Sequence, residues 1–161
     1  NLYADALLKT IGVVRPPKGA PRYSSFERGV QSLVEFWKEK GIKTSPLSIY
    51  DGSGLAPGNK VTVSFLADVY SYMAAKSAYA TDFFLSLPQV GIDGTVRYFL
   101  NGSELQGHAR MKSGSISGVR CYGGYIEQAD KTYAVVVMVN QFSGKSLEVR
   151  KGIEQLLVSL F

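Results

Sequence analysis

Cysteine and histidine are almost absent from this sequence of 161 residues, which contains one of each, Cys121 and His108. An internal disulfide needs two cysteines, and a zinc or iron site needs several cysteine or histidine ligands. We therefore exclude a disulfide within the chain and expect neither a metal site nor a cofactor. Cys121 is expected to pack as a small apolar residue on a strand.

Long apolar runs and clustered basic residues are also lacking. No stretch reaches 18 apolar residues, so no transmembrane helix is predicted, and no signal peptide is visible at the start of the chain. We interpret the sequence as a piece of a longer protein. The net charge of +5 comes from scattered Lys and Arg residues. Because aromatic residues do not alternate with basic ones, as they do on a surface that binds single strands, nucleic acid is not an expected partner.

The composition that remains is that of an ordinary globular protein, with 45% hydrophobic and 19% charged residues. Apolar periodicity predicts long helices over residues 1–11, 24–41 and 146–160, and shorter helices after Thr62 and from Thr81. Ser24 and Glu27 form a capping box at the start of the second long helix. Gly12 is expected to end the first one.

Three strands are predicted over residues 109–115, 119–126 and 133–140. Their connections are short, which requires antiparallel pairing. Because residues 135–139 are apolar on both faces, the third strand is expected to be the central, buried one. The predicted fold class is α+β, an antiparallel sheet flanked by helices.

The stretch Lys112-Ser113-Gly114, at the start of an extended segment, places a cation and a hydroxyl beside a residue without a side chain. A strand edge that carries glycine leaves room for another backbone. An extended peptide can then add to the sheet through main-chain hydrogen bonds, and its carboxylate would meet the ammonium and the hydroxyl. The alternative is an exposed turn that leads into a hairpin.

Several stretches around this triplet occur together, in order, over residues 1–125. They are Asn1-Leu-Tyr-Ala-Asp-Ala-Leu-Leu8, Asp51-Gly-Ser-Gly-Leu55, Leu87-Pro-Gln-Val-Gly-Ile-Asp-Gly-Thr95, Lys112-Ser-Gly-Ser-Ile-Ser-Gly-Val119 and Gly123-Gly-Tyr125. Together they resemble the low-molecular-mass penicillin-binding proteins that act as D-alanyl-D-alanine carboxypeptidases and endopeptidases. That family uses S-x-x-K, S-x-N and K-[ST]-G motifs. The resemblance implies that residues 1–161 are the C-terminal part of a serine β-lactamase/transpeptidase-like domain.

The resemblance also implies roles for six residues. Asn1 would be the Asn of the S-x-N motif, although as a residue ahead of a helix it could also act as the helix cap. Lys112 would supply positive potential, and the backbone N–H of Ser115 would be one donor of the oxyanion hole. The substrate would be bound by Ser113, Gly114 and Ser117. Ser113 replaces the usual Thr of the motif and keeps its hydroxyl.

One element of the family is missing, because no Ser-x-x-Lys occurs in the chain. We therefore expect the nucleophilic Ser and its Lys upstream of Asn1, and expect this chain alone to be inactive. The expected reaction is serine-type hydrolysis of D-Ala-D-Ala peptides. The expected partners are peptidoglycan stem peptides, β-lactam antibiotics, the N-terminal part of the same protein and, for the isolated fragment, a second copy. The implied location is periplasmic, or otherwise extracytoplasmic, at the cell wall.

Two alternatives stay open. The chain could be a non-catalytic module that binds peptidoglycan peptides, or an unrelated α+β interaction domain that resembles the family by chance.

Overall fold

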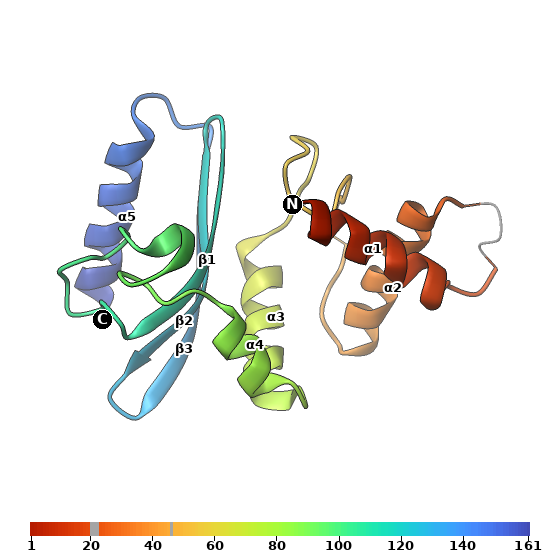
Figure 1. The fold of residues 1–161 in the computed structure, drawn as a ribbon, viewed down its shortest axis with the longest axis horizontal. Coiled ribbons are helices and arrows are strands. Elements are labelled where there is room, and N and C mark those ends of the chain that lie inside the picture. The colour runs from red at the N-terminus through yellow and green to blue at the C-terminus, as the bar shows by residue number, and fades with distance from the viewer. Residues whose placement is uncertain (20–22, 46) are drawn as a thin grey trace. The chain divides into compact units, whose positions relative to one another are not determined.

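The chain folds into two compact units, Asn1–Phe65 and Leu66–Phe161. The structure is a computed structural model that describes residues 1–19, 23–45 and 47–161. Figure 1 labels the elements of both units. The boundary between the units lies inside helix α3, Val63–Lys76. Within the described ranges, no helix is both long and apolar enough to cross a membrane.

The first unit is built on two helices, α1 (Leu2–Val14) and α2 (Ser25–Glu39). The predicted capping box is confirmed at the start of α2. The Ser24 hydroxyl accepts a hydrogen bond from the Glu27 N–H at 3.2 Å, and the Glu27 carboxylate accepts one from the Ser24 N–H at 2.8 Å. These two bonds satisfy backbone donors that the first helical turn leaves without partners.

Close approach of α1 and α2 explains why the predicted end of α1 is wrong. Gly12 lies within the helix, which continues to Val14. A Cβ at Gly12 would lie 1.9 Å from the carbonyl oxygen of Ser25, and one at Gly29 would lie 2.0 Å from that of Leu8. Gly12 is therefore a contact residue between two backbones rather than a helix stop.

A loop held by two carboxylates follows α2. Asp51 accepts hydrogen bonds from the N–H groups of Gly54 and Ala56 at 2.7 and 2.6 Å and from the Asn59 side chain at 2.7 Å. Asp5 of α1 accepts from the N–H of Gly52 at 2.8 Å. These hydrogen bonds order the Asp51-Gly-Ser-Gly-Leu55 stretch as a loop that is tied to α1.

The second unit contains a three-stranded antiparallel sheet of β1 (Ala109–Ile116), β2 (Val119–Gln128) and β3 (Lys131–Asn140). The strands and their antiparallel pairing are confirmed. The prediction that β3 is central is wrong, because within the described sheet the order is β1-β2-β3. Two hairpin connections place β2 between its neighbours, whereas the apolar run of β3 reflects side chains half-buried on both faces.

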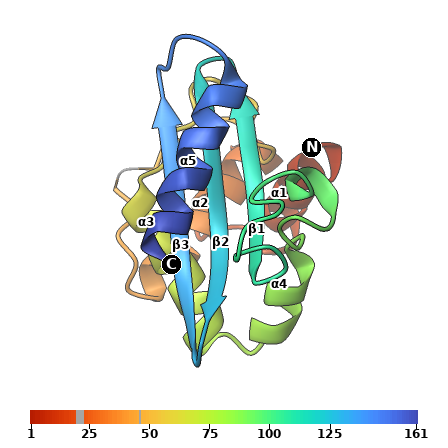
Figure 2. The ribbon, with the colours of Figure 1, turned by 90° about the vertical axis from the view of Figure 1, so that its left-hand side faces the viewer.

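Helices cover both faces of this sheet, and Figures 1 and 2 show the layers. On the α5 face, Ala109, Met111 and Tyr122 pack with Ile153 and Leu157 of α5 (Ser146–Leu160). The 3-10 turn η1 (Gly94–Val96) adds Val96 to that core.

The opposite face of the sheet, the α3–α4 face, packs against α3 and the short helix α4 (Ala80–Ser86). Tyr125 donates a hydrogen bond to the carbonyl of Tyr70 at 2.6 Å and contacts the rings of Phe83 and Phe84. Because successive strand residues alternate between faces, these contacts fix the face to which each β1 side chain belongs.

Candidate active site

Strand β1 has an outer edge that is only partly occupied. Over its first half, the Met111 N–H donates to the Pro88 carbonyl at 3.0 Å, and the Val90 N–H donates to the Ala109 carbonyl at 2.9 Å. Backbone groups of a strand alternate in direction, so those of Ser113 and Ser115 point to the same outer edge. No hydrogen bond joins the N–H of either serine to another residue of the described ranges. The Ser115 N–H is thus presented at an open strand edge.

Ser113 lies on the α5 face and has a hydroxyl neighbour. Its Oγ is 2.7 Å from the Oγ1 of Thr95 in η1, and either atom can be the donor. Ser113 stands opposite Tyr122 in the β1–β2 ladder. Two adjacent hydroxyls can both donate to an anion that replaces their mutual bond.

Lys112 leaves the strand on the α3–α4 face and is exposed. Its ammonium donates to the carbonyl of Ser113, a group that points to the outer edge. Within the described residues it forms no ion pair. The side chain therefore brings a cation to the open edge from the face opposite the hydroxyls.

Gly114 is exposed, and the protein itself does not require a glycine there. A Cβ would lie 3.7 Å from the Cβ of Cys121, which is an ordinary contact. Within the described residues, nothing that contacts this position requires a glycine. Cys121 is half-buried on β2, as expected for a small apolar residue, and burial raises the pKa of its thiol.

The other two predicted residues lie elsewhere. Ser117 is exposed in the turn between β1 and β2. Asn1 belongs to the first unit and precedes α1, and its side chain makes no capping hydrogen bond. The structure therefore groups Lys112, Ser113, Gly114 and Ser115 on one strand edge, with Ser117 in the turn that follows the strand.

Sequence reasoning missed two residues beside this edge. Thr95 pairs with Ser113, and Arg120 stands directly opposite Ser115 in the ladder. Thr95 ends one of the stretches that carry the family resemblance. Arg120 could have been found from the two-residue connection Ser117-Gly118, because that connection sets the register of the hairpin.

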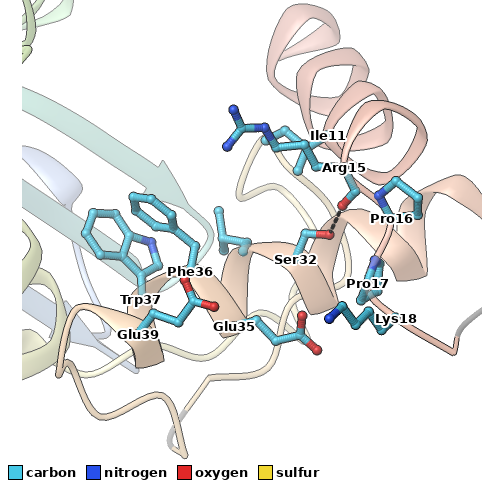
Figure 3. Close-up of a pocket in the computed structure, with 11 residues that line it drawn as sticks. Ile11, Arg15, Pro16, Pro17, Lys18, Ser32, Glu35, Phe36, Trp37 and Glu39 are labelled. Carbon is cyan, nitrogen blue, oxygen red and sulfur yellow. Dashed lines mark hydrogen bonds between the residues drawn. The ribbon is translucent and has the colours of Figure 1, made fainter.

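A separate pocket of about 860 Å³ lies in the first unit, between α1, α2 and the residues that follow α1. Figure 3 shows Phe36 and Trp37 at one end and the Pro16–Lys18 segment at the other. The Ser32 hydroxyl donates to the Arg15 carbonyl at 2.7 Å within it. None of the predicted site residues lines this pocket.

Comparison with known proteins gives a consistent family. The sequence model of the D-Ala-D-Ala carboxypeptidase 3 (S13) family matches residues 1–160. A D-alanyl-D-alanine carboxypeptidase of Actinomadura sp. (strain R39) is 29% identical over 89% of this chain and 27% of its own length. Carboxypeptidase DacB of Mycolicibacterium smegmatis is 25% identical over 89% of this chain and 31% of its own length.

A solved structure matches the whole chain. Penicillin-binding protein 4 (dacB) of Haemophilus influenzae, crystallised with a β-lactam, covers 100% of this chain at 25% identity with a TM-score of 0.85. The match takes up 38% of that protein. The chain thus spans between a quarter and two fifths of the length of these relatives. The match supports the α+β fold and places the chain within the penicillin-binding fold.

Proposed function

The chain belongs to the D-Ala-D-Ala carboxypeptidase 3 (S13) family, and from this membership we propose that its protein cleaves peptidoglycan peptides that end in D-Ala-D-Ala by a serine acyl-enzyme mechanism. The observation that carries the proposal is the Lys112-Ser113-Gly114 triplet at an open strand edge, within a chain that the family model matches from end to end. Carboxypeptidase and endopeptidase action would both use this edge.

In the proposed reaction, a serine Oγ attacks the carbonyl of the penultimate D-Ala while a lysine takes its proton. The peptide C–N bond breaks, the terminal D-Ala leaves as the protonated amine, and water then hydrolyses the ester. No Ser-x-x-Lys occurs in residues 1–161. We therefore assign the nucleophile and its lysine to sequence outside this chain, consistent with the length of the relatives.

This chain would bind and polarise the substrate. The substrate backbone would lie along the outer edge of β1, close to Gly114. The Ser115 N–H would donate to the developing oxyanion, a contact that stabilises a transition state by about 3–4 kcal/mol in related chemistry. Lys112 would supply positive potential at the edge. The Ser113 hydroxyl would bind the terminal carboxylate, Ser117 would contact the substrate further along, and Asn1 would accept its peptide group.

β-Lactams are proposed as ligands of the same edge, because the H. influenzae relative was crystallised with one. A peptidoglycan substrate also implies a location outside the cytoplasm, at the cell wall. A non-catalytic module that binds peptidoglycan peptides is the second candidate, favoured by the absence of a Ser-x-x-Lys within the chain.

A labelling experiment separates the two functions. The full-length protein and the isolated chain of residues 1–161 are incubated with a fluorescent penicillin and run on a denaturing gel. We expect a boiling-resistant band for the full-length protein and none for the isolated chain. A full-length protein that binds the peptides but forms no covalent adduct would support the binding module and contradict the acyl-enzyme.

A further inference from the structure

The segment of residues 88–96 follows α4 and lies beside the outer edge of β1 (Figure 2). It covers only the first half of that edge, through two backbone hydrogen bonds in which Pro88 and Val90 take part. Beyond Val90 the segment turns away from the edge and forms η1. That turn brings Thr95 back to β1 where the covered part of the edge ends, with its Oγ1 2.7 Å from the Oγ of Ser113.

The backbone on both sides of Thr95 is held in place. The Asp93 carboxylate accepts a hydrogen bond from the Gln89 N–H at 2.8 Å, and the Gln89 carbonyl accepts one from the Asp93 N–H at 3.1 Å. Gly94 follows with a φ of 56°, a left-handed conformation that glycine adopts without strain. On the other side of Thr95, Val96 is buried in the core of the α5 face. The fold itself therefore directs the Thr95 hydroxyl toward Ser113.

The Thr95 hydroxyl bonds to another side chain rather than to the backbone. The hydroxyls of Ser86 and Ser159, by contrast, donate to carbonyls of their own helices. Within the described ranges, the hydroxyls of Thr95 and Ser113 have each other as their hydrogen-bond partners. Because the Thr95 side chain is also exposed, its hydroxyl contributes little to holding the fold. Its contact points to a role at Ser113.

The direction of this hydrogen bond decides what the Ser113 hydroxyl can bind. A hydroxyl has one proton to donate and two lone pairs that accept. If Ser113 donates to Thr95, its proton is not available to an anion. If Thr95 donates to Ser113, the Ser113 proton is available to a ligand, and the bond that Ser113 accepts strengthens the one that it donates. An anion beside Ser113 therefore selects the arrangement in which Thr95 is the donor.

We propose that Thr95 is a positioning residue for the Ser113 hydroxyl. It donates to the Ser113 Oγ, fixes the orientation of that hydroxyl and directs its proton to an anionic group of the substrate. Thr95 acts through Ser113 and does not itself contact the substrate. This role rests on the proposed function, which assigns the terminal carboxylate of the peptide to Ser113.

The test uses three variants of the full-length protein. Thr95→Val keeps the branched shape of the side chain and removes the hydroxyl, whereas Thr95→Ser keeps the hydroxyl. Thr132→Val makes the same change at an exposed threonine of β3 and is the matched control. The kcat/KM values are measured for a peptide that ends in a D-Ala-D-Ala acid and for the corresponding amide. Thr95→Val is also measured in a Ser113→Ala background.

We expect Thr95→Val to lower kcat/KM for the acid about 5-fold, the size of one ordinary hydrogen bond, and to change it little for the amide. Thr95→Ser and Thr132→Val should keep the parent values, and all three variants should keep the parent melting temperature. In the Ser113→Ala background, Thr95→Val should have no further effect, because the two residues act as one unit.

Three results would overturn the positioning role while leaving the proposed function standing. They are an unchanged kcat/KM for the acid in Thr95→Val, an equal loss for the acid and the amide, and a loss of the same size in the Ser113→Ala background. A lower melting temperature together with slow hydrolysis of both peptides counts as an equal loss, because it shows that Thr95 supports the fold rather than the Ser113 hydroxyl.

If the parent protein hydrolyses neither peptide, the proposed function fails and a binding measurement decides the role of Thr95. The dissociation constant of N-acetyl-D-alanine is then measured by NMR titration of the full-length protein and of the same variants. Binding that is weakened about 5-fold in Thr95→Val and kept in Thr95→Ser and Thr132→Val would support the role. Absent binding, or binding that is independent of Thr95, would overturn it.

Discussion

At the scale of single residues, the candidate site depends on strand geometry more than on residue type. The side chains of Lys112 and Ser113 leave opposite faces of β1. The Lys112 ammonium lies at the open edge because it donates a hydrogen bond to the Ser113 carbonyl. The Ser115 N–H points to the same edge because backbone direction alternates along a strand. A cation, a hydroxyl and an amide donor can thus approach one extended ligand from three directions.

Replacing Lys112 tests the proposed electrostatic role. Lys112→Ala in the full-length protein should slow acylation by penicillin at least 10-fold, because a charge at the edge is lost where negative charge develops. The melting temperature should not change, since the side chain is exposed. Lys131→Ala, at an exposed lysine of β3, is the control. Equal acylation rates for Lys112→Ala and the parent would show that Lys112 is a surface residue.

Asp51 gives a prediction of pH dependence. Burial acts to raise the pKa of its carboxyl, but the hydrogen bonds from Asn59, Ala56 and Gly54 outweigh it and leave the pKa below the ordinary aspartate value. Their contribution to stability is therefore present above an ordinary aspartate pKa of about 3.9. It is lost as pH falls through the lower, folded value.

The Gly54 amide reports this titration, because its N–H donates to Asp51 at 2.7 Å. We expect the NMR chemical shift of that amide to titrate with a midpoint below the ordinary aspartate value. Asp51→Asn should abolish the titration. A midpoint at or above the ordinary value would mean that the loop does not hold its carboxylate in solution.

At the scale of elements, the sequence predicted features that depend on local spacing and missed those that depend on a partner element. The capping box follows from Ser24 and Glu27 being three residues apart. The local pattern predicts Gly12 as a helix stop. The reason for a glycine there is the close approach of the Ser25 backbone at the α1–α2 crossing, which a local pattern does not reveal. In the same way, the apolar run of β3 predicts that β3 is the central strand, whereas the two hairpin connections place β2 in the centre.

Two helical glycines provide a matched test of the crossing. Gly29→Ala should lower the free energy of unfolding by about 1–3 kcal/mol, because the new methyl group meets the Leu8 backbone, which cannot rotate away. Gly152→Ala, in α5, has no atom within 4 Å of the new Cβ and should instead raise it by about 0.5–1 kcal/mol. Urea unfolding measures both. A neutral Gly29→Ala would rule out the tight crossing.

The candidate site also combines features that local spacing predicts with features that depend on a partner element. The triplet Lys112-Ser113-Gly114 and its place on a strand could be predicted from the sequence. Thr95 could not, because it reaches Ser113 from 18 positions away through the η1 turn. Arg120 could be placed opposite Ser115 from the length of the hairpin connection alone.

At the scale of the whole molecule, the isolated chain exposes surfaces that favour association. The outer edge of β3 pairs with no strand within the described sheet, and residues 134–139 on it are half-buried on both faces. Leu2 and Tyr3 of α1 are 79% and 84% exposed. Free strand edges and contiguous apolar surface promote self-association.

We therefore predict that the isolated chain of residues 1–161 forms dimers or unfolds at low temperature. Light scattering after size exclusion, combined with thermal unfolding, measures both properties. The full-length protein serves as the control, and it should be more stable than the isolated chain. An isolated chain that is a monodisperse monomer with a high melting temperature would contradict the prediction.

The most direct test of the central claim is the release of D-alanine by the full-length protein. A peptide ending in D-Ala-D-Ala and the same peptide ending in D-Ala-L-Ala are incubated with the protein, with and without prior exposure to benzylpenicillin. The account predicts that the first peptide loses one D-Ala, that the second is cleaved far more slowly, and that the β-lactam blocks both. Release that is insensitive to benzylpenicillin, or no release of D-Ala from the first peptide, would contradict the account.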